Sequence, residues 1–326
     1  MKAVLCNKLG GPENLVLGEV DSPKPEPDEV RIRVRAAGLN FADTLQIAGK
    51  YQSKLQTPFI PGMEVAGEIL EIGSNVRRPL IVGQRVMAFM RGGGAFAEEA
   101  CVHGDWLVPV PDAMDDVTAA GFPTAYGTSN FALKHRGQLK AGETLLVLGA
   151  AGGVGLTAVE IGKQMGATVI AAAGGPEKCA VTLDHGADFA IDYKTESIRD
   201  RVREITDGVG ADVVYDAVGG DPFDQAIRAV NWEARMLVIG FASGRIQQVP
   251  ANLILVKNIS VIGVVYGATT ERDPAYGASF VQDAADLFRQ GKVKPHIGKI
   301  FPLAEAGGAF EALLSRAYAG KIVLTT

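Results

Sequence analysis

The chain has 326 residues, of which 47% are hydrophobic and 21% charged, and its formal net charge is −5. This length predicts about two domains with full hydrophobic cores, and the acidic balance excludes the overall basic field of a nonspecific nucleic-acid binder. Three widely spaced cysteines without a CxxC motif, Cys6, Cys101 and Cys179, argue against a disulfide framework or a structural zinc site.

The N-terminal segment contains no long apolar stretch, so we expect no signal peptide. The longest apolar run, residues 145–159, is shorter than a membrane span and rich in glycine. We therefore expect a cytoplasmic protein.

The first third of the chain is typical of β structure. In residues 30–35 apolar side chains alternate with three arginines, which predicts a half-buried strand. Further apolar runs at 64–72 and 85–90 are separated by turns rich in glycine and proline. No long helix is expected before about residue 117. These features favour a small barrel-like or Greek-key unit.

From residue 144 onward, short apolar runs alternate with amphipathic stretches. The predicted strands are 144–148, 168–172, 189–191, 213–215, 236–239 and 259–264. The predicted helices are 153–165, 177–185, 197–206 and 223–230. This alternation indicates an α/β fold, a doubly wound parallel sheet with right-handed crossovers.

After about residue 268 the pattern changes again. Two helices are expected near 280–290 and 303–316, and a short strand at 322–324. We expect this segment to complete the first domain, which gives one domain from 1–121 and 269–326 and a second from 122–268.

A glycine-rich turn follows the first strand of the parallel sheet. The run 145–149 leads directly into Ala150, Ala151, Gly152, Gly153, Val154 and Gly155, and then into a helix. This is the context of a dinucleotide-binding fingerprint, although Ala150 stands at its first glycine position. Gly152 lets the backbone approach a pyrophosphate, Gly155 lets the helix pack on the strand, and the helix N-terminus offers N–H groups to the phosphates.

The end of the next strand distinguishes the two nicotinamide cofactors. An NAD site carries an acidic residue there for the ribose hydroxyls, but residues 171–176 contain no carboxylate. Lys178 follows, and its ammonium is suited to a 2′-phosphate. The alternative is a surface lysine beside Glu177. We predict NADPH as the cofactor.

Further motifs lie along the whole chain, at 38–43, 49–51, 61–67, 149–155, 216–220, 240–244 and 320–324. In this order and at these spacings they resemble the zinc-independent quinone oxidoreductases of the medium-chain dehydrogenase/reductase superfamily. The resemblance implies a GroES-like β-barrel catalytic domain, split in sequence around a Rossmann domain, with NADPH in the cleft between them, and a homodimer or tetramer. We expect strand 259–264 to pair across a dimer, because an apolar sheet edge needs cover.

The resemblance and the ligand chemistry both predict that no metal is bound. Zinc-dependent relatives carry a cysteine where this chain has Asn40 and a histidine where it has Met63, and zinc requires such soft ligands. Cys101 and His103 lie close together without further ligands, and their spacing is typical of one face of a strand.

Without a Lewis acid, the substrate has to be electrophilic already, as a quinone or an α,β-unsaturated carbonyl is. Hydride transfer from the nicotinamide then needs positioning and hydrogen-bond donors for the substrate oxygen, and the proton can come from water. The resemblance places Asn40 and Tyr51 at the nicotinamide; the alternatives are a loop asparagine and a half-buried loop aromatic. Asp43 is expected to orient its neighbours.

The resemblance also assigns the cofactor contacts. Thr128 would bind the carboxamide of the nicotinamide, or else be a helix threonine with a back-bonded hydroxyl. Tyr193 would lie near the adenosine phosphate or only pack, and Lys321 would reach a phosphate or be a surface lysine. The remaining positions are Gly152, Gly153 and Val154 under the pyrophosphate, Gly174 and Lys178 at the 2′-phosphate, Phe241, Ala242 and Ser243 after a strand end, and Val265, Tyr266 and Gly267 near the nicotinamide.

Two other functions remain open. An enoyl or acryloyl thioester reductase would use the same cofactor and hydride step, with Lys50, Lys54 and Arg91 as candidate cations for a thioester carrier. An NADPH-bound RNA-binding or structural protein is the second alternative; the acidic charge and the lack of an aromatic–basic stripe count against nucleic acid. We expect a small-molecule substrate and no membrane partner.

Overall fold

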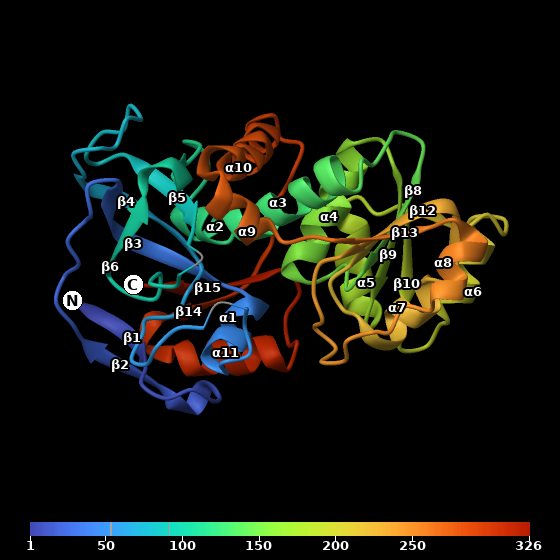
Figure 1. The fold of residues 1–326 in the computed structure, drawn as a ribbon, viewed down its shortest axis with the longest axis horizontal. Coiled ribbons are helices and arrows are strands. Elements are labelled where there is room, and N and C mark those ends of the chain that lie inside the picture. Colours follow the sequence, from blue (N-terminus) through green and yellow to red (C-terminus); the bar gives the residue numbers. More distant parts are fainter. Residues whose placement is uncertain (53, 91) are drawn as a thin grey trace. The chain divides into compact units, whose positions relative to one another are not determined.

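The computed structural model of the chain describes residues 1–52, 54–90 and 92–326, which form two compact units (Figure 1). The first unit comprises Met1–Gly127, Gly267–Arg289 and Pro295–Thr326. The second comprises Thr128–Tyr266 and Gln290–Lys294. Among the described residues, no helix is long and apolar enough to cross a membrane.

The described residues of the first unit form a two-stranded sheet, β1–β2, and a seven-stranded sheet. The larger sheet has the order β14-β15-β3-β4-β5-β7, and β6 also pairs with β3. The strands are β1 (Lys2–Cys6), β2 (Leu15–Glu19), β3 (Glu29–Leu39), β4 (Glu64–Ile72), β5 (Arg85–Phe89), β6 (Glu99–His103), β7 (Val108–Pro109), β14 (Ile297–Pro302) and β15 (Lys321–Thr325).

Strand β3 shows why the sequence alternates in this region. Its side chains at Val30, Ile32 and Val34 are almost completely buried in the apolar core. The arginines between them lie on the other face, where Arg31 forms ion pairs with Glu71 and Glu99 from the neighbouring strands β4 and β6. The predicted half-buried strand is confirmed, and cross-strand charge pairs stabilise its outer face.

The C-terminal segment returns to this sheet, as predicted. Strand β15 pairs antiparallel with β3, placing Ile322 opposite Leu39, and parallel with β14. The helices wholly within this unit are α1 (Phe41–Ile47), α2 (Asp116–Ala120), α10 (Pro274–Arg289) and α11 (Ala306–Leu314), with short 3-10 turns at Pro12–Asn14, Gly104–Trp106 and Leu303–Glu305.

The second unit contains, among the described residues, a six-stranded parallel sheet with the order β10-β9-β8-β11-β12-β13. Numbered within the sheet this order is 3-2-1-4-5-6, the doubly wound Rossmann arrangement, which confirms the predicted fold class. The strands are β8 (Thr144–Leu148), β9 (Thr168–Ala173), β10 (Phe189–Asp192), β11 (Ala211–Asp216), β12 (Val230–Val238) and β13 (Ser260–Gly263).

The helices of this unit alternate with its strands, as the sequence pattern predicts (Figure 1). They are α4 (Gly153–Gln164), α5 (Pro176–Asp184), α6 (Ile198–Ile205), α7 (Gly220–Ala226) and α8 (Ala251–Lys257), preceded by a π-helical segment, Phe131–Arg136. Helices α3 (Pro123–Asn130) and α9 (Tyr266–Arg272) contain the residues at which the chain passes from one unit to the other.

The expected helix at 223–230 is wrong at both ends. Helix α7 begins earlier, at Gly220, directly after Gly219 with its positive φ of 68°. It ends at Ala226, and Val230 already belongs to β12, where it pairs with Ala211 of β11. Residues 227–229 form a turn that leads from the helix into this strand.

Candidate functional site

The turn between β8 and α4 has the geometry of a phosphate cradle. Gly149 has a φ of +69°, and Gly152 precedes the first helical residue, Gly153. A Cβ atom on Gly155 would lie 2.2 Å from the Gly149 carbonyl oxygen, so only glycine allows this contact between turn and helix. A Cβ on Gly152 would meet only that same oxygen, at 3.3 Å. The turn thus leaves open backbone at Gly152 and N–H groups at the start of α4, which suit an anion.

A second glycine turn follows β9, and Tyr193 lies beside it. A Cβ on Gly174 would lie 2.9 Å from the Tyr193 hydroxyl. A Cβ on Gly175 would lie 3.8 Å from Nζ of Lys194, a cation that the sequence analysis did not single out. Lys178 is half-buried on the first turns of α5. The turn therefore brings a phenol and lysine side chains to the end of β9, which suits a 2′-phosphate.

One carboxylate near this turn is engaged by the backbone. Asp192, the last residue of β10, accepts hydrogen bonds through Oδ1 from the N–H of Gly175 at 2.8 Å and of Lys194 at 3.0 Å. This oxygen holds the turn in shape. Asp192 could not be singled out from the sequence, because it is the last residue of β10, while the turn it stabilises follows β9.

Ser129 connects three elements of the second unit. Its completely buried hydroxyl donates to the carbonyl of Val154 at 2.8 Å and lies 2.8 Å from the Thr157 hydroxyl and 3.0 Å from that of Tyr215. Burial raises the pKa of the Tyr215 phenol, which stays neutral. Thr128, the expected carboxamide contact, is half-buried and immediately precedes this anchored serine.

The loop after β12 carries three further predicted contacts. Phe241 and Ser243 are exposed and Ala242 is half-buried. The N–H of Ala242 donates to the carbonyl of Ala217, and that of Ser243 to the carbonyl of Val218. These bonds fix the loop on the turn that follows β11, at the carboxyl end of the sheet, where ligands of such folds bind.

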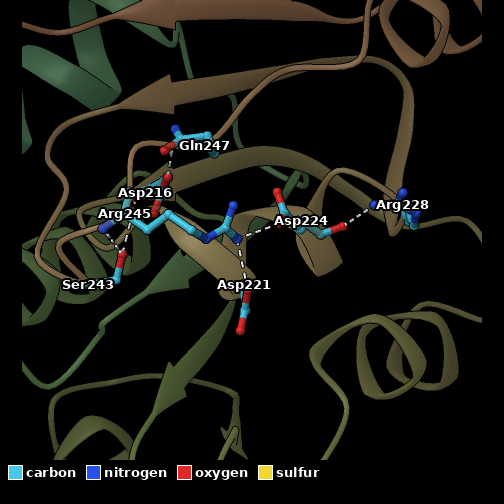
Figure 2. A network of polar contacts seen from close by, with 7 residues as sticks. All are labelled: Asp216, Asp221, Asp224, Arg228, Ser243, Arg245 and Gln247. Atoms are coloured by element: carbon cyan, nitrogen blue, oxygen red, sulfur yellow. Dashed lines mark hydrogen bonds and ion pairs between the residues drawn. The ribbon is translucent and has the colours of Figure 1, made fainter.

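Polar side chains hold the same loop further along (Figure 2). The Arg245 guanidinium forms ion pairs with Asp221 at 2.8 Å and Asp224 at 2.5 Å, both on α7. The Gln247 amide donates to Asp216 at 3.5 Å. Asp216 itself accepts from the N–H of Val218 and Gly219, and burial raises its pKa to about 6. The loop is therefore tied to both the end of β11 and helix α7.

The segment after β13 holds the last predicted contacts of this unit. Val265 is exposed, and Tyr266 is buried with its ring 6.1 Å from that of Phe131, centroid to centroid. Gly267 already belongs to the first unit. Tyr266 thus packs within the second unit, and a contact of this segment with nicotinamide remains a prediction.

The first unit contains a buried polar cluster formed by Asn40, Asp43, Glu64 and Lys321. The Asn40 Nδ2 group donates to Glu64 Oε1 at 2.9 Å, and the Lys321 ammonium donates to Asn40 Oδ1 at 2.7 Å. The ammonium also pairs with Glu64. All four residues are less than 9% exposed, and Glu64 and Asp43 are completely buried. The buried charges of Glu64 and Lys321 are tolerated because they pair with each other and are hydrogen-bonded. Among the described residues, Oδ1 of Asp43 has no hydrogen-bond partner.

The local sequence explains how this cluster is accommodated. Gly38 leaves room for the carboxylate, since a Cβ there would lie 2.2 Å from Glu64 Oε1. The second carboxylate oxygen accepts from the backbone N–H of Thr124 at 2.9 Å. Glu64, which the sequence analysis noted only as part of a motif, is thus the centre of the cluster.

Asp43 has an unusual proton affinity. It lies on the first turn of α1, and its Oδ2 accepts from the N–H of Asn40 at 2.7 Å. The pKa of its carboxyl is raised to about 7, chiefly by burial and also by the Glu64 charge, while the hydrogen bond from the Asn40 N–H and the Lys321 ammonium lower it. This bond holds the Asp43 carboxyl against the Asn40 backbone, and an orienting role in the reaction stays a prediction.

Both interpretations offered for Lys321 need correction. It is not a surface lysine, because it is only 6% exposed. Its three N–H donors are taken by the carbonyl of Leu39 at 3.0 Å, by Asn40 and by Glu64. No donor is left for a phosphate. Tyr51, by contrast, lies half-buried just after α1, with its N–H donating to the carbonyl of Leu45.

Asn40 and Met63, the two positions at which the resemblance would place zinc ligands, are both described by the structure. Asn40 is in the cluster above, and Met63 is buried. In the part of the chain that the structure describes, no three His, Cys, Asp or Glu side chains are grouped as a metal site. Cys101 and His103 both lie on β6, two residues apart as expected, and burial raises the pKa of the Cys101 thiol to about 11.

Comparison with known proteins gives the same assignment for both units. The model of the alcohol dehydrogenase GroES-like domain matches residues 26–112, and that of the zinc-binding dehydrogenase matches residues 153–281. A quinone oxidoreductase-like protein 2 homolog from Nematostella vectensis is 39% identical over 100% of this chain and 89% of its own length.

Other relatives extend over nearly the whole chain. A quinone oxidoreductase from Pseudomonas aeruginosa is 35% identical over 99% of both chains, and a 2-haloacrylate reductase from Burkholderia sp is 31% identical over 99% of this chain and 98% of its own length. The crystal structure of Escherichia coli quinone oxidoreductase complexed with NADPH superposes with a TM-score of 0.91, at 30% identity and covering 100% of both chains. The chain is therefore an oxidoreductase of the quinone oxidoreductase family, within the medium-chain dehydrogenase/reductase superfamily.

Proposed function

We propose that this protein reduces quinones with NADPH, by hydride transfer from the nicotinamide and without zinc. The observation that carries the proposal is the buried cluster around Asn40. Where zinc-dependent relatives are expected to have a thiolate and an imidazole, this chain has an amide held by an ammonium and a carboxylate. The amide of Asn40 and the thioether of Met63 do not replace the thiolate and imidazole that bind zinc. The substrate therefore has to be electrophilic without a metal.

The second unit supports NADPH as the cofactor. The open backbone at Gly152, with Gly153 and Val154 at the start of α4, suits the pyrophosphate. Gly174, Tyr193 and Lys178 suit the 2′-phosphate. A related enzyme has been solved with NADPH. We take residues 122–268 as the NADPH-binding domain and 1–121 with 269–326 as the catalytic domain.

Further contacts complete the proposed cofactor site. Thr128 binds the carboxamide, and the loop after β12 and the segment after β13 border the nicotinamide. These two segments contribute Phe241, Ala242, Ser243, Val265, Tyr266 and Gly267.

The chain's part in the chemistry is to position the substrate and to stabilise charge. Bound NADPH supplies the hydride. Asn40 and Tyr51 donate hydrogen bonds to the substrate oxygen on which negative charge develops. Asp43 fixes the start of α1 through its bond to the Asn40 backbone and so orients the amide. The reduced oxygen then takes its proton from water.

The reduction of an activated alkene is the second candidate. It is favoured by the 31% identity to a 2-haloacrylate reductase, because such a substrate also accepts hydride without a metal. For a thioester substrate, Lys50 and Lys54 are candidate cations near the loop after α1, and Arg91 lies outside the described residues.

The proposal is tested by following NADPH oxidation at 340 nm with a panel of acceptors and with NADH in parallel. The panel contains 1,4-benzoquinone, 9,10-phenanthrenequinone, an alkenal and acryloyl-CoA. Turnover of a quinone with NADPH supports the proposal, and turnover of acryloyl-CoA alone moves the substrate class to enoyl reduction. NADPH binding without any turnover contradicts it and favours the structural or RNA-binding alternative. Elemental analysis that finds about one zinc per chain contradicts the metal-free mechanism.

A further inference from the structure

The orientation of the Asn40 amide is determined by its two charged neighbours. An ammonium has hydrogen-bond donors only, so the amide atom that faces Lys321 at 2.7 Å has to be the carbonyl oxygen. A carboxylate has acceptors only, so the atom that faces Glu64 at 2.9 Å has to be the nitrogen. Rotation of the amide by 180° would set donors against donors and acceptors against acceptors. Lys321 and Glu64 therefore permit one orientation.

Among the described residues, the hydrogen bonds of the Asn40 amide leave one of its donor hydrogens unused. Its nitrogen carries two hydrogens, of which one is directed to Glu64. The three ammonium hydrogens are taken by Leu39, Asn40 and Glu64. The second hydrogen on Nδ2 is thus the remaining strong donor of the pair formed by amide and ammonium.

The geometry points to Lys321 as a positioning residue for the reduction, which acts through Asn40 and not through the cofactor. This inference rests on the proposed function of Asn40 as a donor to the substrate oxygen. The lysine holds the carbonyl end of the amide and thereby directs the remaining Nδ2 hydrogen. A cation at the carbonyl oxygen also draws electron density from the amide nitrogen, which makes that hydrogen a stronger donor.

A phosphate-binding lysine would behave differently from a positioning lysine. Removal of a phosphate contact weakens NADPH binding and leaves the chemical step intact. Removal of a positioning contact lowers the rate of hydride transfer and leaves NADPH binding intact, because only an interaction used in the transition state changes kcat. A comparison of the dissociation constant for NADPH with kcat therefore separates the two roles.

The test uses the full-length protein with Lys321→Met and Lys321→Arg. The matched control is Lys299→Met, since Lys299 lies on the adjacent strand β14, opposite Ile322, and is exposed. Lys321→Met leaves Glu64 without its cation, which destabilises a protein strongly. The double variant Lys321→Met with Glu64→Gln removes both charges and serves if the single variant does not fold.

For Lys321→Met, or for the double variant in its place, we expect kcat with a quinone to fall about tenfold to a hundredfold, as for the loss of an oriented donor. The dissociation constant for NADPH, measured by fluorescence, should stay within about twofold, a change below 0.5 kcal/mol. Lys321→Arg should recover most of the rate, and Lys299→Met should match the wild type. In Lys321→Met the pKa of Asp43 should rise, because the ammonium that lowers it is lost, so the part of the pH profile of kcat that depends on Asp43 should move to higher pH.

An unchanged kcat in a folded variant, or weaker NADPH binding with kcat preserved, overturns the inference. Selective ¹⁵N labelling of asparagine provides a readout that does not depend on turnover. The two Nδ2 hydrogens of Asn40 should give separate, slowly exchanging signals in the wild type and lose that protection in Lys321→Met. If the wild type reduces no quinone but the Asn40 signals lose their protection in Lys321→Met, the proposed function fails, whereas the inference that Lys321 orients the Asn40 amide stands. If the signals are the same in both proteins, the inference itself fails.

Discussion

The guanidinium of Arg245 lies 2.5 Å from the carboxylate of Asp224, and this ion pair joins the loop after β12 to helix α7. Arg245 also pairs with Asp221, one turn earlier on the same helix. Exposed ion pairs such as these contribute little to global stability, because solvent screens them. Their effect is local, since they restrict the loop that carries Phe241, Ala242 and Ser243.

We expect Arg245→Ala to weaken NADPH binding about threefold to tenfold, because the loop must then be ordered when the cofactor binds. The unfolding midpoint should change little. Arg228→Ala is the matched control, since among the described residues Arg228, which follows α7, donates to the backbone carbonyl of Asp224 on that helix. Fluorescence titration with NADPH measures the effect. Equal affinities in all three proteins would show that the ion pairs do not position the loop.

Alanine substitutions of Gly152 and Gly155 in the β8–α4 turn should have different effects. Gly155→Ala forces a Cβ to within 2.2 Å of the Gly149 carbonyl, so we expect a loss of several kcal/mol in stability. Gly152→Ala has room within the protein, with its nearest contact at 3.3 Å, but occupies the open backbone where the pyrophosphate is proposed to lie. We expect it to fold normally and to bind NADPH at least tenfold more weakly. Urea unfolding and NADPH titration of both variants test this; normal NADPH binding by Gly152→Ala would contradict the proposed cradle.

Lys178→Ala should change the Michaelis constant for NADPH far more than that for NADH. If the ammonium binds the 2′-phosphate, the Michaelis constant for NADPH should rise about tenfold or more, as expected for a lost charge-assisted bond. The constant for NADH should hardly change. Lys163→Ala, at the far end of α4, is the control, because Lys163 pairs with Asp188 away from the cradle. Equal increases for NADPH and NADH would remove Lys178 from the phosphate site.

Asp43 should make stability depend on pH. Its pKa of about 7 in the folded protein lies above the ordinary value of 3.8, so the folded state holds the proton more tightly than the unfolded state. The contribution of this proton to the free energy of unfolding is complete below about pH 4 and is lost as pH rises through 7. The loss is about 4 kcal/mol, at about 1.36 kcal/mol for each unit of pKa shift.

We expect Asp43→Asn to flatten the fall in stability between pH 4 and 7 and to raise the free energy of unfolding at pH 8 relative to the wild type. Asp286→Asn is the control, since that exposed side chain pairs with Arg289 on its own helix. Urea unfolding across this pH range measures the difference. A wild-type slope that persists in Asp43→Asn would place the titrating group elsewhere.

Strand β13 lies at the edge of the six-stranded sheet, next to β12. An edge strand with Val261 and Ile262 only half-buried is suited to pairing with a second copy. We expect a homodimer in sedimentation-velocity experiments at micromolar concentration. A monomer under these conditions would contradict that expectation.

The sequence predicted those features that depend on local patterns. The period-two alternation of β3 and the turn from β8 to Gly155 are visible within a few residues, because strand pleating and glycine geometry act over that range. The engagement of Lys321 could not be predicted in this way. A lone lysine after a glycine is ordinarily exposed, and only the register between β15 and β3 brings it to Asn40 and Glu64. The early end of α7 has the same origin, since the pairing of Val230 with Ala211 is tertiary.

The hydrogen bond from Lys321 to the Asn40 amide also determines how late during protein synthesis the buried cluster can form. Asn40 and Lys321 are separated by 281 positions in the chain. At about 5–20 residues per second, a ribosome needs on the order of 15 to 60 s to travel that distance. A nascent chain that has folded its β3–β4 pair holds the Glu64 carboxylate without its cation until Lys321, 257 positions after Glu64, has been made. The first unit can be complete only after β15 has emerged from the ribosome. A chain that ends just before Lys321 would therefore lack the hydrogen bond to Asn40 but would still contain the proposed NADPH-binding domain.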